Sequence, residues 1–433
     1  MRNIRRAGAI LGSLVMAVTA TVVAVPARAA DGPLPAGYRV VGREQLEPGV
    51  DYLTLRRDQP PQNVHLARIA PGLSNRLRPV LSSDVMTGPA AGPENTSSMC
   101  ARVRCVVAVN GDFAGPGGAL VGAMVARGEL VATMGIPQWQ LNFDSAGRAT
   151  VHDRLDVSVH VDTPDGQALG VQRVNRPLLG ENVNLYSRRW GPSTLTDAGA
   201  VEVVLGLASA DVLPSGVTPI RSVTLRPGGN AAIGPNQVVL AGRGAGARAL
   251  TALAQRASGG TASLVVQTAA AESIGAAPHL LTRGRLAFDP AEAGSFMQGR
   301  HPRTMVGFTA SGETLMVAVD GRRSASTGMS LGEAASFMAG LGASEAVNFD
   351  GGGSTTFVTR GSVRNQPSEG GERRVVSALA LVAAGDAAAP SPAAPPSAPR
   401  TTPTDPASFL PDLVNALLQP LLNQLAGQPP PAR

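Results

Sequence analysis

Between about Gly37 and Gly385 the sequence is a continuous succession of short apolar runs, separated by residues that favour turns. Runs of this length with few helical patterns between them are typical of β-rich folds. The expected strands are Val64–Ile69, Val106–Val109, Leu155–Val161, Ala200–Leu207, Ser263–Gln267, Thr304–Phe308, Leu315–Val319, Glu345–Phe349 and Thr355–Thr359. The sequence therefore predicts a mixed α/β (α+β) fold that is β-rich, with short strands and few helices, in a single domain over residues 31–385.

One helix is well marked in this domain. In "SLGEAASFMAGLG", Ser330 and Glu333 have the spacing of a capping box. The apolar residues that follow recur at helical spacing on one face, and they are Ala334, Phe337, Met338 and Leu341. Gly340 and Gly342 are available to end the helix.

The first thirty residues are predicted to be a secretory signal peptide. Arg2, Arg5 and Arg6 give a basic start, an apolar run extends from Ala9 to Val25, and Ala27-Arg28-Ala29 has the form of a cleavage site. The alternative is an uncleaved membrane anchor, but the run is short for a spanning helix. A cleaved leader predicts an exported protein.

The C-terminal part of the chain has a different composition. Residues 386–406 are rich in Pro, Ala, Ser and Thr, which predicts a disordered linker. Residues 407–433 contain an amphipathic helix that Pro420 should kink. Within it, residues 407–427 could contact a membrane surface or a partner, or could fold back on the main domain.

The two cysteines, Cys100 and Cys105, are predicted to form a disulfide, since an exported protein meets an oxidising environment. The bridge would fix the start of the strand Val106–Val109. Structural zinc sites need four ligands, so two isolated cysteines do not indicate one.

Every basic residue apart from histidine is arginine, because the sequence contains no lysine. This excludes Schiff-base chemistry on lysine and a P-loop lysine. Contacts with phosphate must then come from arginine or from backbone N–H groups. The net charge of +6 favours anionic partners, but the arginines are scattered and aromatic residues are few, so nucleic-acid binding is not expected.

The stretch "AVNFDGGGSTTFV" holds the most distinctive turn of the sequence. Gly351, Gly352 and Gly353 allow a ligand to approach the main chain closely, and Ser354 and Thr355 add hydroxyl donors. The alternative is a plain hairpin turn. Asn348 and Asp350 alternate with apolar residues, so their side chains should share one face of the strand.

Other strands end in the same kind of polar sequence. "VVAVNGDF" ends in Asn110 and Asp112, "HPRTMVGF" begins with Arg303 and Thr304, and "VAVDGRR" ends in Asp320 and Arg322. If the strands that precede Asp320 and Asp350 are parallel neighbours, the two carboxylates should face the same rim of a sheet.

Together these pieces resemble the phosphodiester glycosidase family. The resemblance extends from about Gly37 to Ala384 and is carried by "NGDF", "HPRTMVGFTASGETLMVAVDGR", "GMSLGEAASFMAGLGASEAVNFDGGGST" and "VRNQPSEGGERRVVSALAL", with "VNRPLLGENVNLYSRRWG" and "SIGAAPHLLTRGRL" between them. That family includes the lysosomal uncovering enzyme, which removes N-acetylglucosamine from phosphodiester-linked mannose. It also includes secreted bacterial members that are often associated with exopolysaccharide.

The sequence departs from the family pattern in three places. Ala114 follows "NGDF" where the family often has an aromatic residue, and Phe349 precedes the glycines where it often has leucine. Residues 275–277 read Gly-Ala-Ala where Gly-Gly is frequent, which could alter the shape of the pocket.

The resemblance implies a secreted or cell-envelope hydrolase of bacterial type that cleaves a sugar from a sugar-1-phosphodiester in a glycan or exopolysaccharide. A phosphate leaving group needs charge neutralisation, which Arg303, Arg322 and the N–H groups of Gly351–Gly353 could supply. Asp350 and Asp320 are the candidates to activate water or to attack the anomeric carbon. The residues expected to bind substrate or phosphate are completed by Thr304, Ser354, Thr355, Asn110, Asp112, Asn175 and Asn348, of which the last four would hold sugar hydroxyls.

Other chemistries remain open. Asp112, Asp320 and Asp350 could instead bind a divalent cation through oxygen ligands. The histidines lack the spacing of a zinc site, and His301 is the one to watch as a proton carrier because it lies near Arg303. The alternatives to an enzyme are a glycan-binding protein that keeps the pocket without turnover, and an exopolysaccharide assembly factor that acts through its C-terminal helix.

Overall fold

The computed structural model describes residues 32–115, 118–208, 213–257, 261–289 and 298–383. The predicted signal peptide (1–30), the linker (386–406) and the C-terminal helix and tail (407–433) lie outside these residues.

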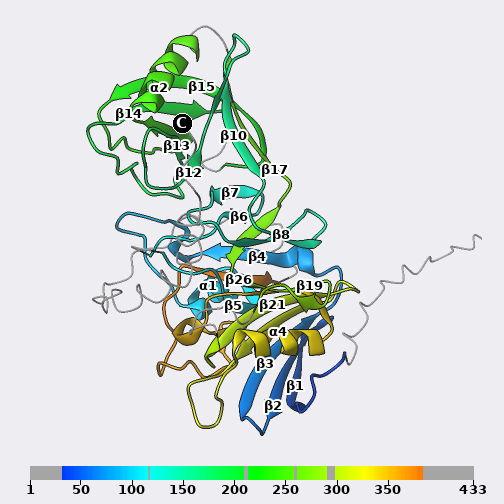
Figure 1. The fold of residues 1–433 in the computed structure, drawn as a ribbon. Helices are drawn as coiled ribbons and strands as arrows, with labels where there is room; N and C mark the ends of the chain where they lie inside the picture. Colours follow the sequence, from blue (N-terminus) through cyan, green and yellow to red (C-terminus); the bar gives the residue numbers. More distant parts are fainter. Residues whose placement is uncertain (1–31, 116–117, 209–212, 258–260, 290–297, 384–433) are drawn as a thin grey trace, which may run out of the picture.

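The lower part of the molecule in Figure 1 is built on an eight-stranded sheet. Its paired strands are antiparallel. In spatial order they are β1 (Arg39–Glu47), β2 (Val50–Arg57), β3 (Gln62–Ile69), β22 (Thr314–Val319), β21 (Arg303–Thr309), β23 (Ala343–Asn348), β19 (His279–Thr282) and β20 (Arg285–Leu286). The central strands are almost fully buried, because both faces of the sheet are covered.

Helix α4 (Leu331–Gly340) covers one face of this sheet. The predicted capping box is present, since the Ser330 hydroxyl accepts from Glu333 N and the Glu333 carboxylate accepts from Ser330 N. Phe337 and Met338 pack with Leu315 and Val317 of β22. The predicted helix is therefore confirmed, with its apolar face on the sheet.

The opposite face packs against a five-stranded sheet through a second apolar layer. This sheet contains, in order, β25 (Ser362–Val363), β24 (Phe357–Thr359), β5 (Cys105–Asn110), β26 (Ser377–Val382) and β4 (Leu77–Leu81). Its outer face is covered by α1 (Thr96–Arg102). The disulfide between Cys100 of α1 and Cys105 of β5 is present, so it fixes the start of β5 as expected.

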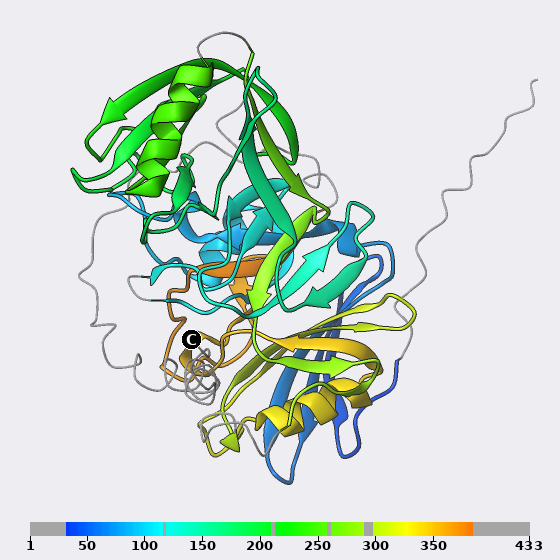
Figure 2. The same ribbon diagram turned by 45° about the horizontal axis from the view of Figure 1, so that its top comes forward.

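Two further sheets form the middle and the upper lobe of the molecule (Figure 2). The middle sheet contains β7 (Glu129–Ala132), β6 (Met124–Ala126), β18 (Glu272–Ala276), β8 (Trp139–Phe143) and β9 (Ala149–His152). The upper sheet contains β11 (Ala168–Gly170), β10 (Val157–Asp162), β17 (Ser263–Thr268), β15 (Gly216–Pro227), β14 (Val201–Leu207), β16 (Gln237–Gly242), β13 (Val183–Tyr186) and β12 (Arg173–Val174). Helix α2 (Ala245–Arg256) packs on the upper sheet through Leu250 and Leu253.

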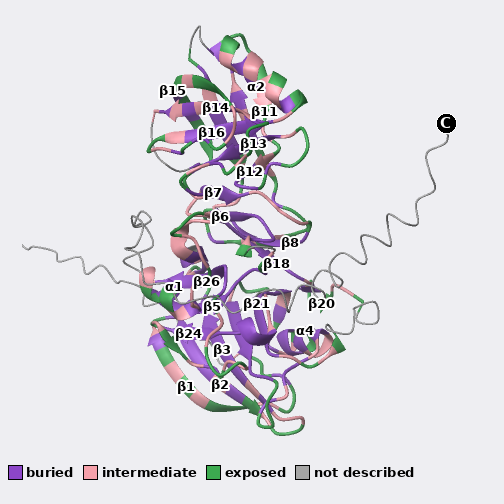
Figure 3. Cartoon of the chain, turned by 90° about the vertical axis from the view of Figure 1, so that its left-hand side faces the viewer, coloured by how far each residue is buried: buried purple, intermediate pink, exposed green. Residues whose placement is uncertain are grey.

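The two lobes have separate apolar cores, which appear as buried strands in both halves of Figure 3. Each strand expected from the sequence coincides wholly or in part with an observed strand. The β-rich prediction is confirmed, whereas the α/β label fits loosely because helices are few. Within the described residues, none of the helices has the length and apolarity needed to cross a bilayer.

Candidate active site

The strand order brings three of the predicted charged residues to one rim of the large sheet. β22 ends at Val319 and β23 ends at Asn348, and each is antiparallel to β21, which begins at Arg303. The two strands are therefore parallel in direction, but they are not neighbours as the prediction assumed, because β21 lies between them. Asp320, Arg303 and Asp350 consequently lie along the same edge.

The turn after β23 needs glycines for two reasons: its backbone conformation, and neighbouring atoms that leave no room for a Cβ. Gly352 has a φ of +61°, and its N–H donates to Pro302 O at 2.9 Å. A Cβ on Gly351 would lie 2.9 Å from Pro302 O, and a Cβ on Gly353 would lie 2.2 Å from Oε1 of Glu369. The turn is thus approached closely by other groups, which a plain hairpin does not require.

Two guanidinium groups lie against this turn. A Cβ on Gly352 would be 2.9 Å from Nη2 of Arg322, which is exposed. Arg373 Nη1 lies 3.5 Å from the Ser354 hydroxyl, and Arg373 also forms an ion pair with Glu369. Arginine pairs of this kind suit a doubly pronged contact with phosphate oxygens.

The lowered pKa of His301 reflects the positive charge at this rim. Its Nδ1 is 3.4 Å from Nε of Arg322. Burial, with the charges of Arg303 and Arg322, lowers the pKa of His301 to about 4, so the imidazole is neutral at pH 7. The effect on the pKa of His301 shows that both guanidinium groups lie close to it. Their positive charges also favour a bound anion at this rim.

The Asp350 carboxylate occupies the start of the turn. Its Oδ2 accepts from the Ser354 hydroxyl at 2.5 Å, and the residue is partly buried. Desolvation raises the pKa of Asp350 to about 6, against the lowering influence of Ser354, Arg373 and the Gly351 N–H. The charge of Asp112 adds to the increase. A carboxylate with such a pKa can exchange a proton near neutral pH.

Asn110 and Thr304 join the turn to two strands. Asn110 Nδ2 donates to Asp350 O at 2.7 Å, and its Oδ1 accepts from Thr304 Oγ1 at 2.7 Å and from Thr356 N at 3.1 Å. Asn110 is fully buried. Asn110 thus holds the backbone of Asp350, and Thr304 holds Asn110, while their predicted contact with substrate stays a prediction.

Arg303 is directed toward the segment before α4. Its Nε donates to Met329 O at 2.9 Å and its Nη2 donates to Gly299 O at 3.0 Å. Burial and the nearby Arg322 lower the pKa of Arg303 to about 10, which still leaves it charged at neutral pH. Its observed contacts fix the rim, so its predicted role at the phosphate stays a prediction.

Asp320 has a more enclosed environment than Asp350. One carboxylate oxygen accepts from Gln366 N at 2.9 Å, and the other is 3.5 Å from Nε2 of His65. The other ring nitrogen of His65 is 2.7 Å from the Tyr52 hydroxyl. Asp320 is 2% exposed, and both of its carboxylate oxygens face groups of the protein.

The remaining predicted residues fall into two groups. Asn348 lies beside the turn, where its Nδ2 donates to Ala277 O and its buried Oδ1 lacks a partner among the described residues. The buried Thr355 hydroxyl likewise lacks one in the described part of the chain. Asn175 instead follows β12 and bonds Val131 O and Ser187, so the structure does not bring it to the turn.

A three-carboxylate cation site is not formed. Among the described residues, no three His, Cys, Asp or Glu side chains lie together as metal ligands. The oxygens of Asp112 and Asp320 are directed to donors of the protein instead. The predicted cation set of Asp112, Asp320 and Asp350 is therefore incorrect for this arrangement.

Sequence reasoning missed Arg373, Glu369, His65 and Gln138. Arg373 lies in the quoted "GGERRVV" stretch, but nothing in its local pattern indicates that it returns to the glycine turn. Gln138 precedes β8 and donates to Asp112 at 2.8 Å. Both depend on contacts between distant parts of the sequence.

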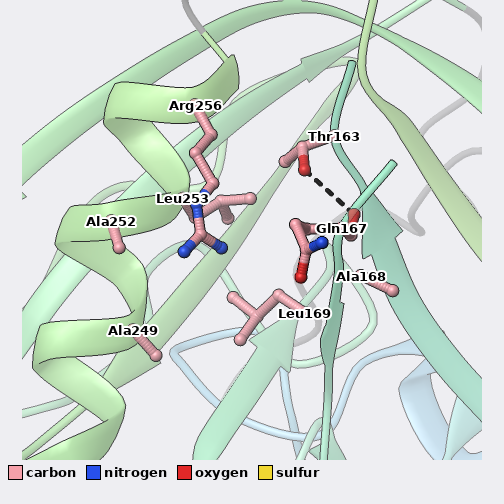
Figure 4. A pocket seen from close by; sticks show the side chains of 8 residues that line it. All are labelled: Thr163, Gln167, Ala168, Leu169, Ala249, Ala252, Leu253 and Arg256. Atoms are coloured by element: carbon pink, nitrogen blue, oxygen red, sulfur yellow. Dashed lines mark hydrogen bonds between the residues drawn. The ribbon is translucent and has the colours of Figure 1, made fainter. Parts of the chain in front are cut away.

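A separate pocket of about 170 Å³ lies in the upper lobe (Figure 4). Arg256 and Leu253 of α2 face the β10–β11 turn across it, where Thr163 Oγ1 donates to Gln167 O at 2.9 Å. None of its lining residues belongs to the glycine turn or to the charged rim, so it is not part of the candidate active site.

Comparison with protein families gives one relevant match, to the phosphodiester glycosidase family over residues 193–382. This segment includes the charged rim and the glycine turn, so the resemblance seen in the sequence is confirmed there. Comparison with curated proteins gives no match.

Solved structures with a similar fold include a hypothetical protein from Synechocystis, with a TM-score of 0.59, 21% identity, and coverage of 80% of this chain and 68% of that chain. A protein of Burkholderia pseudomallei, described as exported, has a TM-score of 0.55, 27% identity, and coverage of 75% and 74%. The zebrafish N-acetylglucosamine-1-phosphodiester α-N-acetylglucosaminidase catalytic domain, auto-inhibited by its pro-peptide, has a TM-score of 0.44, 15% identity, and coverage of 80% and 87%.

Proposed function

Because residues 193–382 match the phosphodiester glycosidase family, we propose that this protein is a hydrolase that cleaves a sugar from a sugar-1-phosphodiester. The observation that carries the proposal is one arrangement at the rim. A carboxylate with a pKa of about 6, that of Asp350, adjoins a glycine turn flanked by Arg322 and Arg373. A glycosidase acting on a phosphodiester needs both parts, an acid–base group and an anion-binding surface.

Arg322 and Arg373 are the proposed phosphate ligands. The N–H of Gly352 donates to Pro302 O and the N–H of Gly351 bonds the Asp350 carboxylate, so among the three glycines only the N–H of Gly353 is proposed to bind phosphate. A phosphodiester leaves as a stable phosphomonoester anion, so charge neutralisation helps its departure more than protonation does. Arg303 would add to the positive field from beneath the turn, since its Cδ is 3.8 Å from a Cβ placed on Gly351.

Asp350 is the proposed reacting carboxylate. In its ionised form it would activate water, or attack the anomeric carbon, and stabilise the positive charge that develops on the sugar ring. Water adds to C1 and the C1–O bond breaks, which releases the free sugar and a phosphomonoester. We assign Asp320 to the support of Arg322, because its oxygens contact His65 and Gln366.

The unpartnered Oδ1 of Asn348 is the proposed acceptor for a sugar hydroxyl. Asn348 is the last residue of β23, two residues before Asp350, and it is buried beside residues 277–278. A buried acceptor of this kind favours a sugar that carries a hydroxyl at the matching position. A sugar without that hydroxyl would leave the acceptor without a hydrogen bond, which costs free energy.

We further propose that the protein acts outside the cytoplasm on a glycan or exopolysaccharide. The signal-peptide pattern of residues 1–30 supports export. The Burkholderia protein of similar fold is itself described as exported.

The test is to incubate the purified protein with a panel of sugar-1-phosphodiesters and to measure free sugar. Wild type should release sugar, and Asp350→Asn should not, while both retain binding. Binding by both proteins with no release from any member of the panel would favour the glycan-binding alternative. Deleting residues 386–433 tests the role of the C-terminal segment in the assembly alternative. Unchanged turnover with lost surface association would make this segment an address and not a part of the catalytic site.

A further inference from the structure

Glu369 places a carboxylate directly beside the proposed phosphate site. Its two oxygens accept from one edge of the Arg373 guanidinium, from Nε at 3.0 Å and from Nη2. A Cβ added to Gly353 would collide with Oε1 of Glu369 and with Nη2 of Arg373. The carboxylate and the guanidinium therefore both lie against the main chain of Gly353, the glycine whose N–H is proposed to bind phosphate.

The loop that carries Glu369 is anchored on both sides of this residue. Before it, Gln366 N donates to a carboxylate oxygen of Asp320 at 2.9 Å. After it, the Glu372 carboxylate accepts from Ser97 N at 2.9 Å. Because the backbone is held at these two points, the charge of Glu369 stays near the turn when an anion binds.

The contact with Glu369 uses only one edge of the Arg373 guanidinium. Nη1, on the other edge, lies 3.5 Å from the Ser354 hydroxyl, which in turn bonds the Asp350 carboxylate. The pair of Glu369 and Arg373 is partly exposed, with 39% of the Glu369 side chain accessible. Ion pairs this exposed contribute little to stability, so folding alone does not account for a carboxylate at this position.

The charge of Glu369 affects which anions the site can accept. Arg322 and Arg373 bring two positive charges to the turn, and Glu369 cancels one of them. Near neutral pH a phosphodiester carries one negative charge, whereas a phosphomonoester carries nearly two, because its second pKa is about 6. Coulomb repulsion grows with the product of the charges, so Glu369 opposes a monoester about twice as strongly as a diester.

We propose that Glu369 is a specificity-determining residue, whose carboxylate makes the site accept the monoanion of a phosphodiester and reject the dianion of a phosphomonoester. The same repulsion favours product release, since cleavage converts the diester into a monoester. This inference rests on the proposed function, because it concerns the phosphate side of that site.

The closing experiment measures binding without turnover, by ³¹P NMR titration of the protein with methyl phosphate and with dimethyl phosphate at pH 8. At this pH the first probe is a dianion and the second a monoanion. The ratio of the two affinities isolates the effect of charge, because a shift of Arg373 would affect both probes alike. In Glu369→Gln this ratio should rise about 5-fold in favour of methyl phosphate, as expected for one extra unit charge about 4 Å away in water.

Two further variants are the controls. Glu369→Asp keeps the charge, so it should keep the wild-type ratio even though its shorter side chain changes the contact with Arg373. Glu372→Gln removes the same charge three residues along the loop, where the carboxylate bonds Ser97 N, and it should leave the ratio unchanged. The change in Glu369→Gln should also diminish at about 1 M salt, because salt screens interactions between charges.

An unchanged ratio in Glu369→Gln, or an equal change in Glu372→Gln, would overturn the inference. A loss of kcat of about 10³-fold in Glu369→Gln would also overturn it, since that loss would make Glu369 a reacting carboxylate. Glu369→Ala removes the same charge and replaces Glu369→Gln if that variant does not fold.

Binding and turnover separate this inference from the proposed function. A protein that binds the probes with the expected ratios but hydrolyses no sugar-1-phosphodiester would refute the proposed function and support the role of Glu369. A hydrolase whose ratio does not respond to Glu369→Gln would do the reverse. A wild-type protein that binds neither probe would refute both.

Discussion

Two aspartate–glycine turns end the parallel-running strands β22 and β23, and the structure treats them differently. Asp350 is partly buried, bonds Ser354 and adjoins Arg373. Asp320 is 2% exposed and bonds Gln366 N beside His65. The comparison shows that equivalent positions on one rim have different surroundings, which depend on what packs against each strand end. In the proposed mechanism Asp350 is the reacting group and Asp320 its support.

The largest effect should separate the two carboxylates in catalysis. Asp350→Asn removes the proposed base or nucleophile, so kcat should fall roughly 10³-fold, as for other removed acid–base groups. Asp320→Asn should reduce kcat far less, because its carboxylate acts through the Arg322 loop. Steady-state kinetics on a sugar-1-phosphodiester measures both, and equal losses would remove the distinction.

The phosphate side of the site gives the next prediction. Arg322→Gln removes a charged partner of the substrate from an exposed position over Gly352, so KM should rise about 10-fold or more with a smaller change in kcat. Arg243→Gln in the upper lobe is the matched control, since that arginine pairs with Asp197. A KM that responds equally to both variants would point to general electrostatics.

The comparison can also be tested through stability. Desolvation raises the folded-state pKa of Asp350 to about 6 from an ordinary value of 3.8. The folded state then binds the proton more tightly than the unfolded chain, so this contribution to stability is fully present below pH 3.8 and is lost as pH rises through 6. At pH 7 Asp350→Asn should therefore increase the free energy of unfolding by roughly 3 kcal/mol.

Urea unfolding between pH 4 and pH 8 measures this effect as the difference between wild type and Asp350→Asn. The difference should grow with pH across that window. A difference that stays constant would show that Asp350 titrates with an ordinary pKa, and the site would lose its acid–base group.

The smallest effect is expected on the supporting side of the rim. Asp320→Asn keeps an oxygen that can accept from Gln366 N but removes the charge beside His65, so the protein should lose about 1 kcal/mol of stability. The same urea measurements give this value at pH 7. A gain in stability, like that expected for Asp350→Asn, would show that the two carboxylates have the same role.

Much of the fold follows from local pattern. The strands and α4 could be predicted because apolar runs, turn residues and a capping box are short-range signals. The common rim of Asp320, Arg303 and Asp350 was also predictable in outline. The intervening position of β21 was not, because strand order depends on long-range pairing.

The site was less predictable than the fold. The direction of the Arg303 guanidinium, the enclosure of Asp320 and the arrival of Arg373 at the turn all depend on segments distant in sequence. Asn175 is the converse case. A recognisable motif included it among the predicted site residues, but in the fold its side chain bonds Val131 O and Ser187, away from the turn. Motifs identify residue types, and only the packing decides which of them meet.

The most direct measurement of the central claim is ³¹P NMR of a sugar-1-phosphodiester in H₂¹⁸O. Cleavage at the anomeric carbon by a site built on Asp350 predicts a phosphomonoester without ¹⁸O, a free sugar that carries it, and neither product with Asp350→Asn. A phosphate that carries ¹⁸O, or equal turnover by wild type and Asp350→Asn, would contradict it.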